Sequence, residues 1–377
     1  MRIAINALSV RANYAGIGIY TKNLVDALSH IDKKNHYLLL LNVENYHDFC
    51  VHQENFENLI VWAPFKKYYI WEQFYQPFIL KKKKIDLIHG PRAVLPLFCG
   101  IKSVVTIHDL AFLLFPEFMP FNPIRYWDIF VKRSVLKADH VIAVSENTKR
   151  DLVRSLNIPE SKISVTYEGC NGNFKMIREK SVLAPISEKY GLPHRFILYV
   201  GTIEPRKNLN VLLLALQILK RKHSISPKLV MVGKKGWLYS DFFKTIHTLK
   251  LEDDIVFIGY VQEEDLPYIY NLADVFVYPS KYEGFGLPLL EAMACGVPVI
   301  ASNTSSIPEV LGDAGLLFSP DDPGHLSECI FEILANEASR ERMVLGGLKR
   351  VQLFSWQETA QQTLNIYETI CNRTPRL

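Results

Sequence analysis

Short apolar runs rich in β-branched and aromatic residues alternate with longer, helix-like segments along almost the whole chain of 377 residues. This alternation predicts βαβ units, and therefore parallel sheets covered by helices on both faces. The runs fall into two series, so the fold class we predict is α/β with two such sheets. We expect strands at residues 2–8, 37–42, 59–62, 86–89, 103–107 and 140–144 in the first series, and at 196–200, 228–232, 255–258, 275–278, 297–301 and 315–318 in the second.

Two series of strands indicate two domains, which agrees with a chain longer than one ordinary hydrophobic core. We predict a first domain over residues 1–180 and a second over 190–355, followed by a last segment, 356–377, whose pattern is helical. A polar stretch with glycines and prolines, at about residues 171–193, is interpreted as the linker. A hydrophobic content of 49% and a charged content of 22% are globular values and argue against disorder.

Residues 283–291 (Glu-Gly-Phe-Gly-Leu-Pro-Leu-Leu-Glu) place two carboxylates around a glycine-rich turn that opens a helix. Glycines allow the backbone to approach a ligand closely, and the N-terminus of a helix attracts phosphate. Carboxylates repel phosphate, so Glu283 and Glu291 are expected to accept hydrogen bonds from sugar and ribose hydroxyls. We interpret the stretch as a sugar-nucleotide site. The alternative is that Glu283 is a solvated loop residue and Glu291 an exposed helix residue.

A basic pair, Arg206 and Lys207, lies where the expected strand at 196–200 gives way to a helix, within residues 201–208 (Gly-Thr-Ile-Glu-Pro-Arg-Lys-Asn). This position suits a diphosphate, with lysine as a point charge and arginine as a fork. A merely solubilising role is the alternative. After the first strand, Gly16 and Gly18 form a Gly-x-Gly turn without a third glycine, because Thr21 stands there, and this disfavours an NAD site.

Residues 201–208 and 283–296 resemble the donor-site signatures of the retaining family-4 glycosyltransferases, which have the GT-B fold. Further matches lie at residues 13–20, 86–91, 106–109 and 141–148, so the resemblance covers nearly the whole chain. It implies two Rossmann-like domains that face each other across an interdomain cleft. The first domain is then expected to bind the acceptor and the second the nucleotide sugar, with the last helix packing back on the first domain.

The resemblance implies catalytic roles for His108, Arg206, Lys207 and Glu283. The basic pair assists departure of the nucleoside diphosphate, whose phosphate takes the acceptor proton on the same face, while Glu283 holds the sugar. His108 faces the transferred sugar, although a His-Asp pair at a strand end is often only structural. The implied donor-binding residues are Gly16, Gly18, Gly201, Thr202, Val261, Phe285, Gly286, Leu287 and Glu291. Asp109 and Ser145 are candidates for the acceptor side or the cleft, and helix capping is the alternative around Ser145.

The motifs are most similar to those of bacterial mannosyltransferases of surface polysaccharide and lipopolysaccharide synthesis, so GDP-mannose is the first donor we expect. UDP-glucose, UDP-N-acetylglucosamine and dTDP-rhamnose remain open. Some relatives have a basic residue directly after the strand glycine, where this chain has Thr202. No metal is expected if the basic pair neutralises the diphosphate. A nucleotide-sugar epimerase and a non-catalytic sugar-nucleotide-binding protein are the alternatives from other classes.

The aromatic-rich segment 68–78 is followed by four lysines, Lys81, Lys82, Lys83 and Lys84. Aromatic rings beside basic groups favour an anionic lipid surface, although a lysine run is also typical of a solvated helix end. A net charge of +4 is too small to indicate nucleic acid. The sequence predicts no transmembrane helix, signal peptide, zinc site or disulfide, so we expect a cytoplasmic protein, peripheral at the inner face of the membrane.

Overall fold

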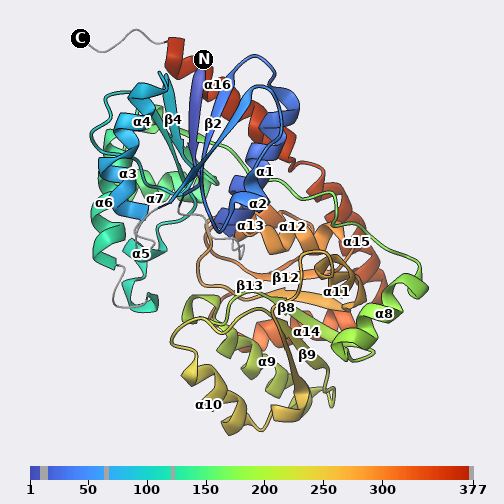
Figure 1. The fold of residues 1–377 in the computed structure, drawn as a ribbon. Coiled ribbons are helices and arrows are strands. Elements are labelled where there is room, and N and C mark those ends of the chain that lie inside the picture. Colours follow the sequence, from blue (N-terminus) through green and yellow to red (C-terminus); the bar gives the residue numbers. More distant parts are fainter. Residues whose placement is uncertain (9–15, 63–67, 120–123, 373–377) are drawn as a thin grey trace. The chain divides into compact units, whose positions relative to one another are not determined.

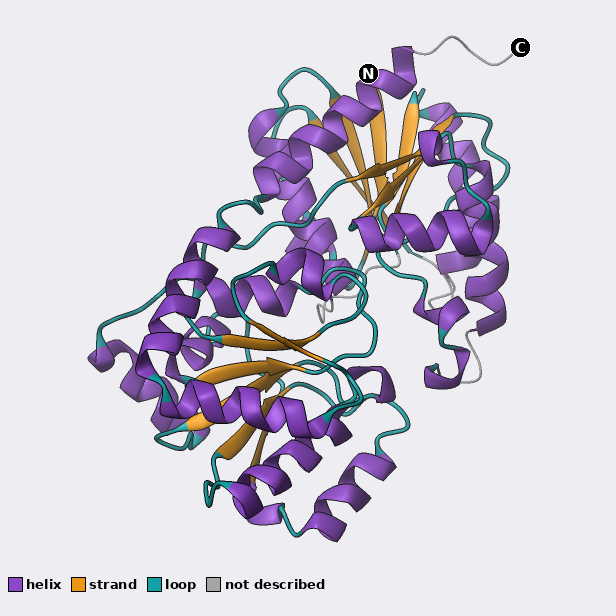
Figure 2. Ribbon diagram, turned by 180° about the vertical axis from the view of Figure 1, so that it is seen from behind, coloured by secondary structure: helices purple, strands orange, loops and turns teal. Residues whose placement is uncertain are grey.

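The computed structural model describes residues 1–8, 16–62, 68–119 and 124–372. The chain folds into two compact units. Unit 1 comprises Met1–Leu114, Phe121–Gly169 and Ser355–Leu377, and unit 2 comprises Phe115–Pro120 and Cys170–Phe354. Each unit contains one parallel sheet with helices on both faces; Figure 2 shows the strands in orange and the helices in purple. The predicted fold class is therefore confirmed.

The sheet of unit 1 has seven strands in the order β3-β2-β1-β4-β5-β6-β7. Strands β2 and β4 of this sheet are labelled in Figure 1. The chain builds outward from β1 to β3 and then returns to the other side of β1 at β4, so the order reverses between β1 and β4. The strands are β1 (Arg2–Asn6), β2 (His36–Asn42), β3 (Phe56–Val61), β4 (Leu87–Gly90), β5 (Lys102–Ile107), β6 (His140–Ala143) and β7 (Ile163–Val165). The helices are α1 (Gly16–Ile31), α2 (Tyr46–Phe49), α3 (Tyr68–Phe74), α4 (Gln76–Lys82), α5 (Ala111–Leu114), α6 (Ile124–Lys137), α7 (Glu146–Leu156), the 3-10 turn η3 (Glu160–Lys162) and α16 (Trp356–Asn372).

The sheet of unit 2 has six strands in the order β10-β9-β8-β11-β12-β13, so its order reverses between β8 and β11. Open parallel sheets bind ligands outside the carboxyl ends of the strands at such a switch point. The strands are β8 (Phe196–Val200), β9 (Lys228–Val232), β10 (Ile255–Gly259), β11 (Val275–Tyr278), β12 (Val299–Ser302) and β13 (Leu316–Phe318). The helices are η2 (Pro116–Phe118), α8 (Lys180–Tyr190), η4 (Pro205–Lys207), α9 (Leu209–Lys222), α10 (Ser240–Leu249), η5 (Glu252–Asp254), α11 (Leu266–Leu272), α12 (Leu287–Ala294), α13 (Ile307–Leu311), α14 (Pro323–Ala335) and α15 (Glu337–Val351).

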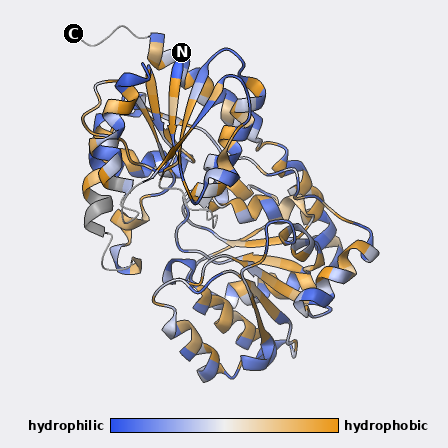
Figure 3. Ribbon diagram, in the orientation of Figure 1, coloured by the Kyte–Doolittle hydropathy of each residue, from blue (hydrophilic) through white to orange (hydrophobic). Residues whose placement is uncertain are grey.

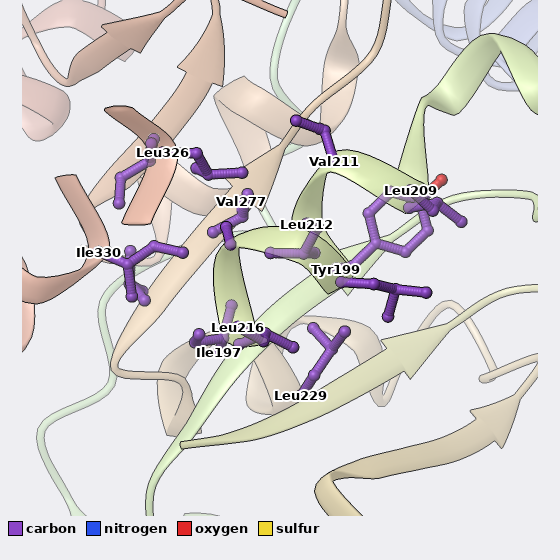
Figure 4. Packing of buried hydrophobic residues seen from close by; sticks show 14 of the residues in the cluster. Ile197, Tyr199, Leu209, Val211, Leu212, Leu216, Leu229, Val277, Leu326 and Ile330 are labelled. Carbon is purple, nitrogen blue, oxygen red and sulfur yellow. The ribbon is translucent and has the colours of Figure 1, made fainter. Parts of the chain in front are cut away.

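The central strands are buried on both faces, which explains why they appear in the sequence as continuous apolar runs rather than as alternating ones. All five residues of β8 are buried. On one face, Ile197 and Tyr199 pack with side chains of α9, β9, β11 and α14, as Figure 4 shows. Figure 3 shows hydrophobic colouring along the central strands of both sheets. This core fixes the carboxyl end of β8, and with it the loop that follows.

Every predicted strand is present, with bounds shifted by at most a few residues, and the structure adds β7. The predicted linker at 171–193 differs more, because the long segment of unit 2 begins at Cys170 and the stretch contains α8, which packs on α11. The last helix, α16, belongs to unit 1 and packs against α1. Within the described residues, no helix has the length and apolar character needed to cross a membrane.

Candidate functional site

The loops that follow β8 and β11 meet at the switch point of unit 2. The loop after β8 carries Arg206 and Lys207 in the turn η4, and the loop after β11 carries Glu283. Because β8 and β11 are adjacent parallel strands, their carboxyl ends place these loops side by side. The backbone joins them as well, since Lys281 N donates to Arg206 O at 2.9 Å. The structure therefore brings together three of the residues predicted from separate sequence motifs.

Glu283 is the centre of a buried group of charges. Its Oε1 lies 2.5 Å from Lys207 Nζ and its Oε2 lies 2.9 Å from Arg206 Nη1. Lys207 Nζ also donates to Tyr278 Oη at 3.2 Å. Glu283 is 7% exposed and Lys207 is 8% exposed, so these are not solvated surface pairs. The surface alternatives for these two residues are thereby excluded.

Glu204 completes the group from within the predicted basic motif. One of its oxygens, Oε1, accepts from Arg206 Nε at 3.1 Å and from Nη2 at 2.8 Å. Arg206 Nη1 additionally donates to Tyr282 O at 2.7 Å. The guanidinium fork thus faces protein acceptors on the loops of both switch-point strands. Arg206 holds the two loops together in this structure, and contact with a diphosphate remains a prediction for it.

The charges of the four groups balance. Burial by itself raises the pKa of Glu283, but Arg206 and Lys207 outweigh it and hold this pKa at about 2, so the carboxylate is ionised. Burial raises the pKa of Glu204, with Arg206 acting in the opposite direction. Burial also lowers the pKa of Lys207, which the charge of Glu283 opposes. Two carboxylates facing two cations give a low net charge in a site that is already removed from water.

Two glycines in the loops have conformations that a side chain would disturb. Gly201 has φ of +154°, and a Cβ there would lie 2.7 Å from Tyr199 Oη. Gly286 has φ of +112° and forms the N-cap of α12, followed by Pro288 in the first turn. The sequence predicts close approach of the backbone to a ligand at Gly286, and the family resemblance implies donor binding at Gly201.

Glu291 lies one turn into α12 and is 8% exposed. Its Oε2 accepts from Tyr270 Oη at 2.8 Å. Burial raises its pKa to about 7, although the bond from Tyr270 opposes the shift. The exposed-helix alternative is excluded, and a carboxylate with this pKa changes charge near neutral pH.

The other predicted donor-binding residues mostly contribute packing and backbone. The Phe285 ring packs against Phe354 at 5.8 Å between centroids, and its carbonyl accepts from Ser306. Leu287 and Val261 are buried, and the Thr202 carbonyl accepts from Tyr199 Oη at 3.1 Å. Within the described residues, no group of three or more His, Cys, Asp or Glu side chains is placed to hold a metal ion.

In unit 1, His108 follows β5 and both of its ring nitrogens have partners. Nε2 lies 2.9 Å from Pro91 O, and Nδ1 lies 3.1 Å from Glu168 Oε1. A carbonyl oxygen only accepts, so Nε2 carries a hydrogen, and the contact between Nδ1 and the carboxylate then requires one proton between them. The edge of the ring also meets Tyr20, at 4.7 Å between centroids. A histidine held in this way is oriented, and neither nitrogen is left as a free base.

Asp109 and Ser145 have local structural roles. Asp109 Oδ1 accepts from Ala111 N at 2.9 Å, so the carboxylate that the His108 ring contacts is Glu168. Ser145 is the N-cap of α7 and accepts from Thr148 N at 3.0 Å, which agrees with the capping alternative. Gly16 and Gly18 lie in the first turn of α1, and residues 13–15 of the predicted turn lie outside the described residues.

The sequence motifs predict no role for Glu204, Tyr278 or Glu168. Glu204 stands inside the basic motif and Tyr278 ends a predicted strand, so position relative to the strands could have suggested both. Glu168 follows β7, a strand that the sequence pattern did not reveal.

Both halves of the chain match family models. Residues 14–173 match the glycosyltransferase family 4 model, and residues 186–350 match the glycosyl transferases group 1 model. O-antigen chain mannosyltransferase B of Escherichia coli is 37% identical over 296 residues, which are 78% of this chain and 77% of that protein. The chain belongs to the family-4 glycosyltransferases.

Another relative of this glycosyltransferase is much longer than the aligned region. The serotype-specific mannosyltransferase WbdA of Escherichia coli is 29% identical over 272 residues, which are 70% of this chain and 33% of WbdA. Among solved structures, sucrose-phosphate synthase from Thermosynechococcus elongatus matches with a TM-score of 0.77 at 23% identity, covering 98% of this chain and 99% of that one. HepE of Anabaena in complex with UDP-glucose matches with a TM-score of 0.74 at 18% identity, covering 98% and 100%. These likenesses confirm the GT-B type of fold.

Proposed function

We propose that this glycosyltransferase is a retaining mannosyltransferase. It moves mannose from GDP-mannose to a hydroxyl of a growing glycan or lipid-linked saccharide in surface polysaccharide synthesis. The relatives that support this are mannosyltransferases by name, and the one at 37% identity is named for the O-antigen chain. The observation that carries the proposal is the buried group of Lys207, Arg206 and Glu283 at the switch point of unit 2.

In this proposal Lys207 and Arg206 stabilise the diphosphate as it leaves, so most of the catalysis is charge stabilisation. The leaving phosphate takes the acceptor proton on the same face of the sugar, which retains the anomeric configuration. Glu283 accepts from hydroxyls of the donor sugar in addition to its two cations, because an ionised carboxylate has about four acceptor positions. Glu291 accepts from the ribose. The His108 ring, which its two partners hold in one orientation, faces the sugar. Arg206 and Lys207 neutralise the diphosphate, so the reaction needs no metal ion.

The donor assignment is tested by calorimetric titration of the purified protein with GDP, UDP and dTDP, and with their sugar conjugates, without added metal. Selective binding of GDP supports the mannosyl donor. Selectivity for UDP or dTDP instead favours UDP-glucose, UDP-N-acetylglucosamine or dTDP-rhamnose. Product analysis with the sugar nucleotide alone distinguishes the other class, because an epimerase converts the donor without an acceptor. Absence of binding by all three nucleotides contradicts the proposed activity.

Lys207→Ala tests the site directly. Charge-assisted hydrogen bonds contribute about 1.5–3 kcal/mol, so loss of this ammonium is expected to raise the Kd for GDP by about 10- to 100-fold. Lys244→Ala is the matched control, since the Lys244 side chain is 75% exposed on α10 and pairs only at the surface with Asp241. Thermal unfolding of both variants checks that the fold is kept. A Kd for Lys207→Ala equal to that of the control contradicts the site.

Peripheral contact with an anionic membrane is a second part of the proposal, supported by a surface of unit 1. Phe74 ends α3 and is 67% exposed, Phe78 lies on α4 and is 74% exposed, and Tyr75 between the two helices is 62% exposed. Lys81 and Lys82 end α4 and are exposed beside these rings. Lys83 differs, because it forms an ion pair with Glu57. Exposed aromatic rings next to free lysines are typical of a helix that lies in a lipid interface.

A further inference from the structure

A short segment from the first half of the chain is part of unit 2. Phe115–Pro120 group with unit 2, whereas the residues before and after them group with unit 1. The chain thus leaves unit 1 directly after α5, seven residues beyond His108. Phe115 and the turn η2 carry the contacts that make this segment part of unit 2.

Two contacts hold the segment to unit 2. The Trp237 indole Nε1 donates to Phe118 O. The Phe115 ring lies against the Tyr282 ring with 5.2 Å between centroids and an angle of 45° between the planes. The rings of Phe115 and Phe118 stack with 5.6 Å between their centroids, so the two ends of the turn are packed against each other.

The two contacts lie on opposite sides of the loop that carries Arg206 and Lys207. Trp237 is in the loop after β9 and Tyr282 is in the loop after β11, and these strands are the two neighbours of β8 in the sheet. Phe115 contacts the loop after β11, and Phe118 contacts the loop after β9. The segment therefore crosses the carboxyl edge of the sheet at β8.

Both contact residues connect further to the charged group. Tyr282 is 4% exposed, its carbonyl accepts from Arg206 Nη1 at 2.7 Å, and Glu283 is the next residue. Gly236, which precedes Trp237, donates its N–H to Ile203 O at 3.1 Å, on the loop that continues to Arg206. A ligand bound at Arg206 and Glu283 would therefore also restrain the surfaces on which Phe115 and Phe118 rest.

We propose that Phe115 and Trp237 are positioning residues for the His108 loop, through which nucleotide binding in unit 2 is transmitted to that loop. Phe115 packs against Tyr282 and so responds to restraint of that residue, while the hydrogen bond from Trp237 fixes the other end of the segment. The single turn of α5 connects the segment to His108, so restraint of the segment also restrains the His108 loop. This inference rests on the proposed function, because it requires a nucleotide at the Arg206–Glu283 group. In this role Phe115 and Trp237 act through the loop and do not contact the substrate.

The test compares hydrogen exchange of the amides of residues 108–114 with and without saturating GDP, or UDP if GDP does not bind. The Leu113 and Leu114 amides, which both donate to Leu110 O, report on α5. The wild type is expected to show slowing of this exchange by about tenfold on nucleotide binding. Phe115→Leu, which removes the ring contact with Tyr282, and Trp237→Phe, which removes the indole N–H donor together with part of the ring, are expected to abolish most of the slowing. Both are expected to change the nucleotide Kd by less than about threefold.

Phe98→Leu is the matched control, because Phe98 is 82% exposed in unit 1, and it is expected to retain the wild-type slowing. Equal slowing in the wild type and both variants overturns the inference. So does a wild-type protein that binds nucleotide with no change of exchange at 108–114, and this outcome leaves the proposed function intact. If calorimetry shows that the wild type binds none of GDP, UDP and dTDP, the proposed function fails and the inference fails with it.

Discussion

Glu291→Gln replaces a buried carboxylate by a neutral amide of nearly the same shape. Glu291 is 8% exposed in α12, and its Oε2 accepts from Tyr270 Oη at 2.8 Å. The amide oxygen of glutamine can accept the same hydrogen bond. The substitution therefore changes the charge of the site while leaving its packing nearly as it is.

The structure gives the size and the sign of the effect. Burial raises the pKa of Glu291 from 4.5 to about 7. Below pH 4.5 the folded and unfolded states both hold the proton. As the pH rises toward 7, the unfolded chain loses its proton first, so the free energy of unfolding falls. At about 1.4 kcal/mol per pKa unit the whole shift amounts to about 3 kcal/mol, of which about 2.5 kcal/mol falls between pH 5 and pH 8.

The assay is equilibrium unfolding in urea at pH 5 and pH 8, followed by circular dichroism and fitted with one transition for each unit. From pH 5 to pH 8 the wild type is expected to lose about 2.5 kcal/mol more than Glu291→Gln, since all other titrating groups are common to both. Glu341→Gln, at an exposed position of α15, is the control and is expected to follow the wild type. A difference below about 0.5 kcal/mol, or one of opposite sign, refutes the argument from burial.

Three further predictions concern the same surfaces. In the proposed function, ribose hydroxyls donate to the ionised form of Glu291, so the wild-type affinity for GDP is expected to rise about tenfold from pH 6 to pH 8, and calorimetry on Glu291→Gln should show no such rise. Glu283→Gln leaves two buried cations without their shared partner and is expected to lower the free energy of unfolding at pH 7 by about 3 kcal/mol; a loss below about 1 kcal/mol in urea would contradict the ion-pair geometry. Phe74→Ser with Phe78→Ser is expected to reduce co-sedimentation with anionic phospholipid vesicles by about fivefold, while Phe98→Ser does not, and equal losses would reject the lipid-facing surface.

Most of the fold can be predicted from the sequence, because parallel strands that are covered on both faces appear in the sequence as short continuous apolar runs. The predicted bounds of β9 and β11 agree with the structure, since both are short apolar runs between polar segments. β7 has three residues at the edge of its sheet, and only the first of them is buried, so neither its length nor its hydrophobicity distinguishes it. α8 was interpreted as part of a linker because Pro185 lies inside the helix, where proline is unfavourable.

The site was predictable where its residues follow a predicted strand directly. Lys207 and Glu283 stand in the loops after β8 and β11, and strand order then brings them together. Glu168 lies 60 residues beyond His108 and three residues after β7, so the missed strand also concealed this partner. The direction in which Arg206 points depends on where Glu204 and the Tyr282 carbonyl lie, which spacing alone does not specify.

The balanced charges of this group bear on how unit 2 meets its ligand. Arg206 and Glu283 join the loops after β8 and β11 through buried ion pairs, so the cost of removing these charges from water is already met in the folded chain. A diphosphate that enters then meets cations held in fixed positions, which is the condition under which electrostatic stabilisation is most effective. Glu204 and Glu283 weaken the local positive potential, and a strongly positive site would bind any phosphate. In the proposed function, selectivity must therefore come from groups that touch the sugar and the nucleoside, and the proposal gives this discriminating role to Glu283 and Glu291 rather than to the cations.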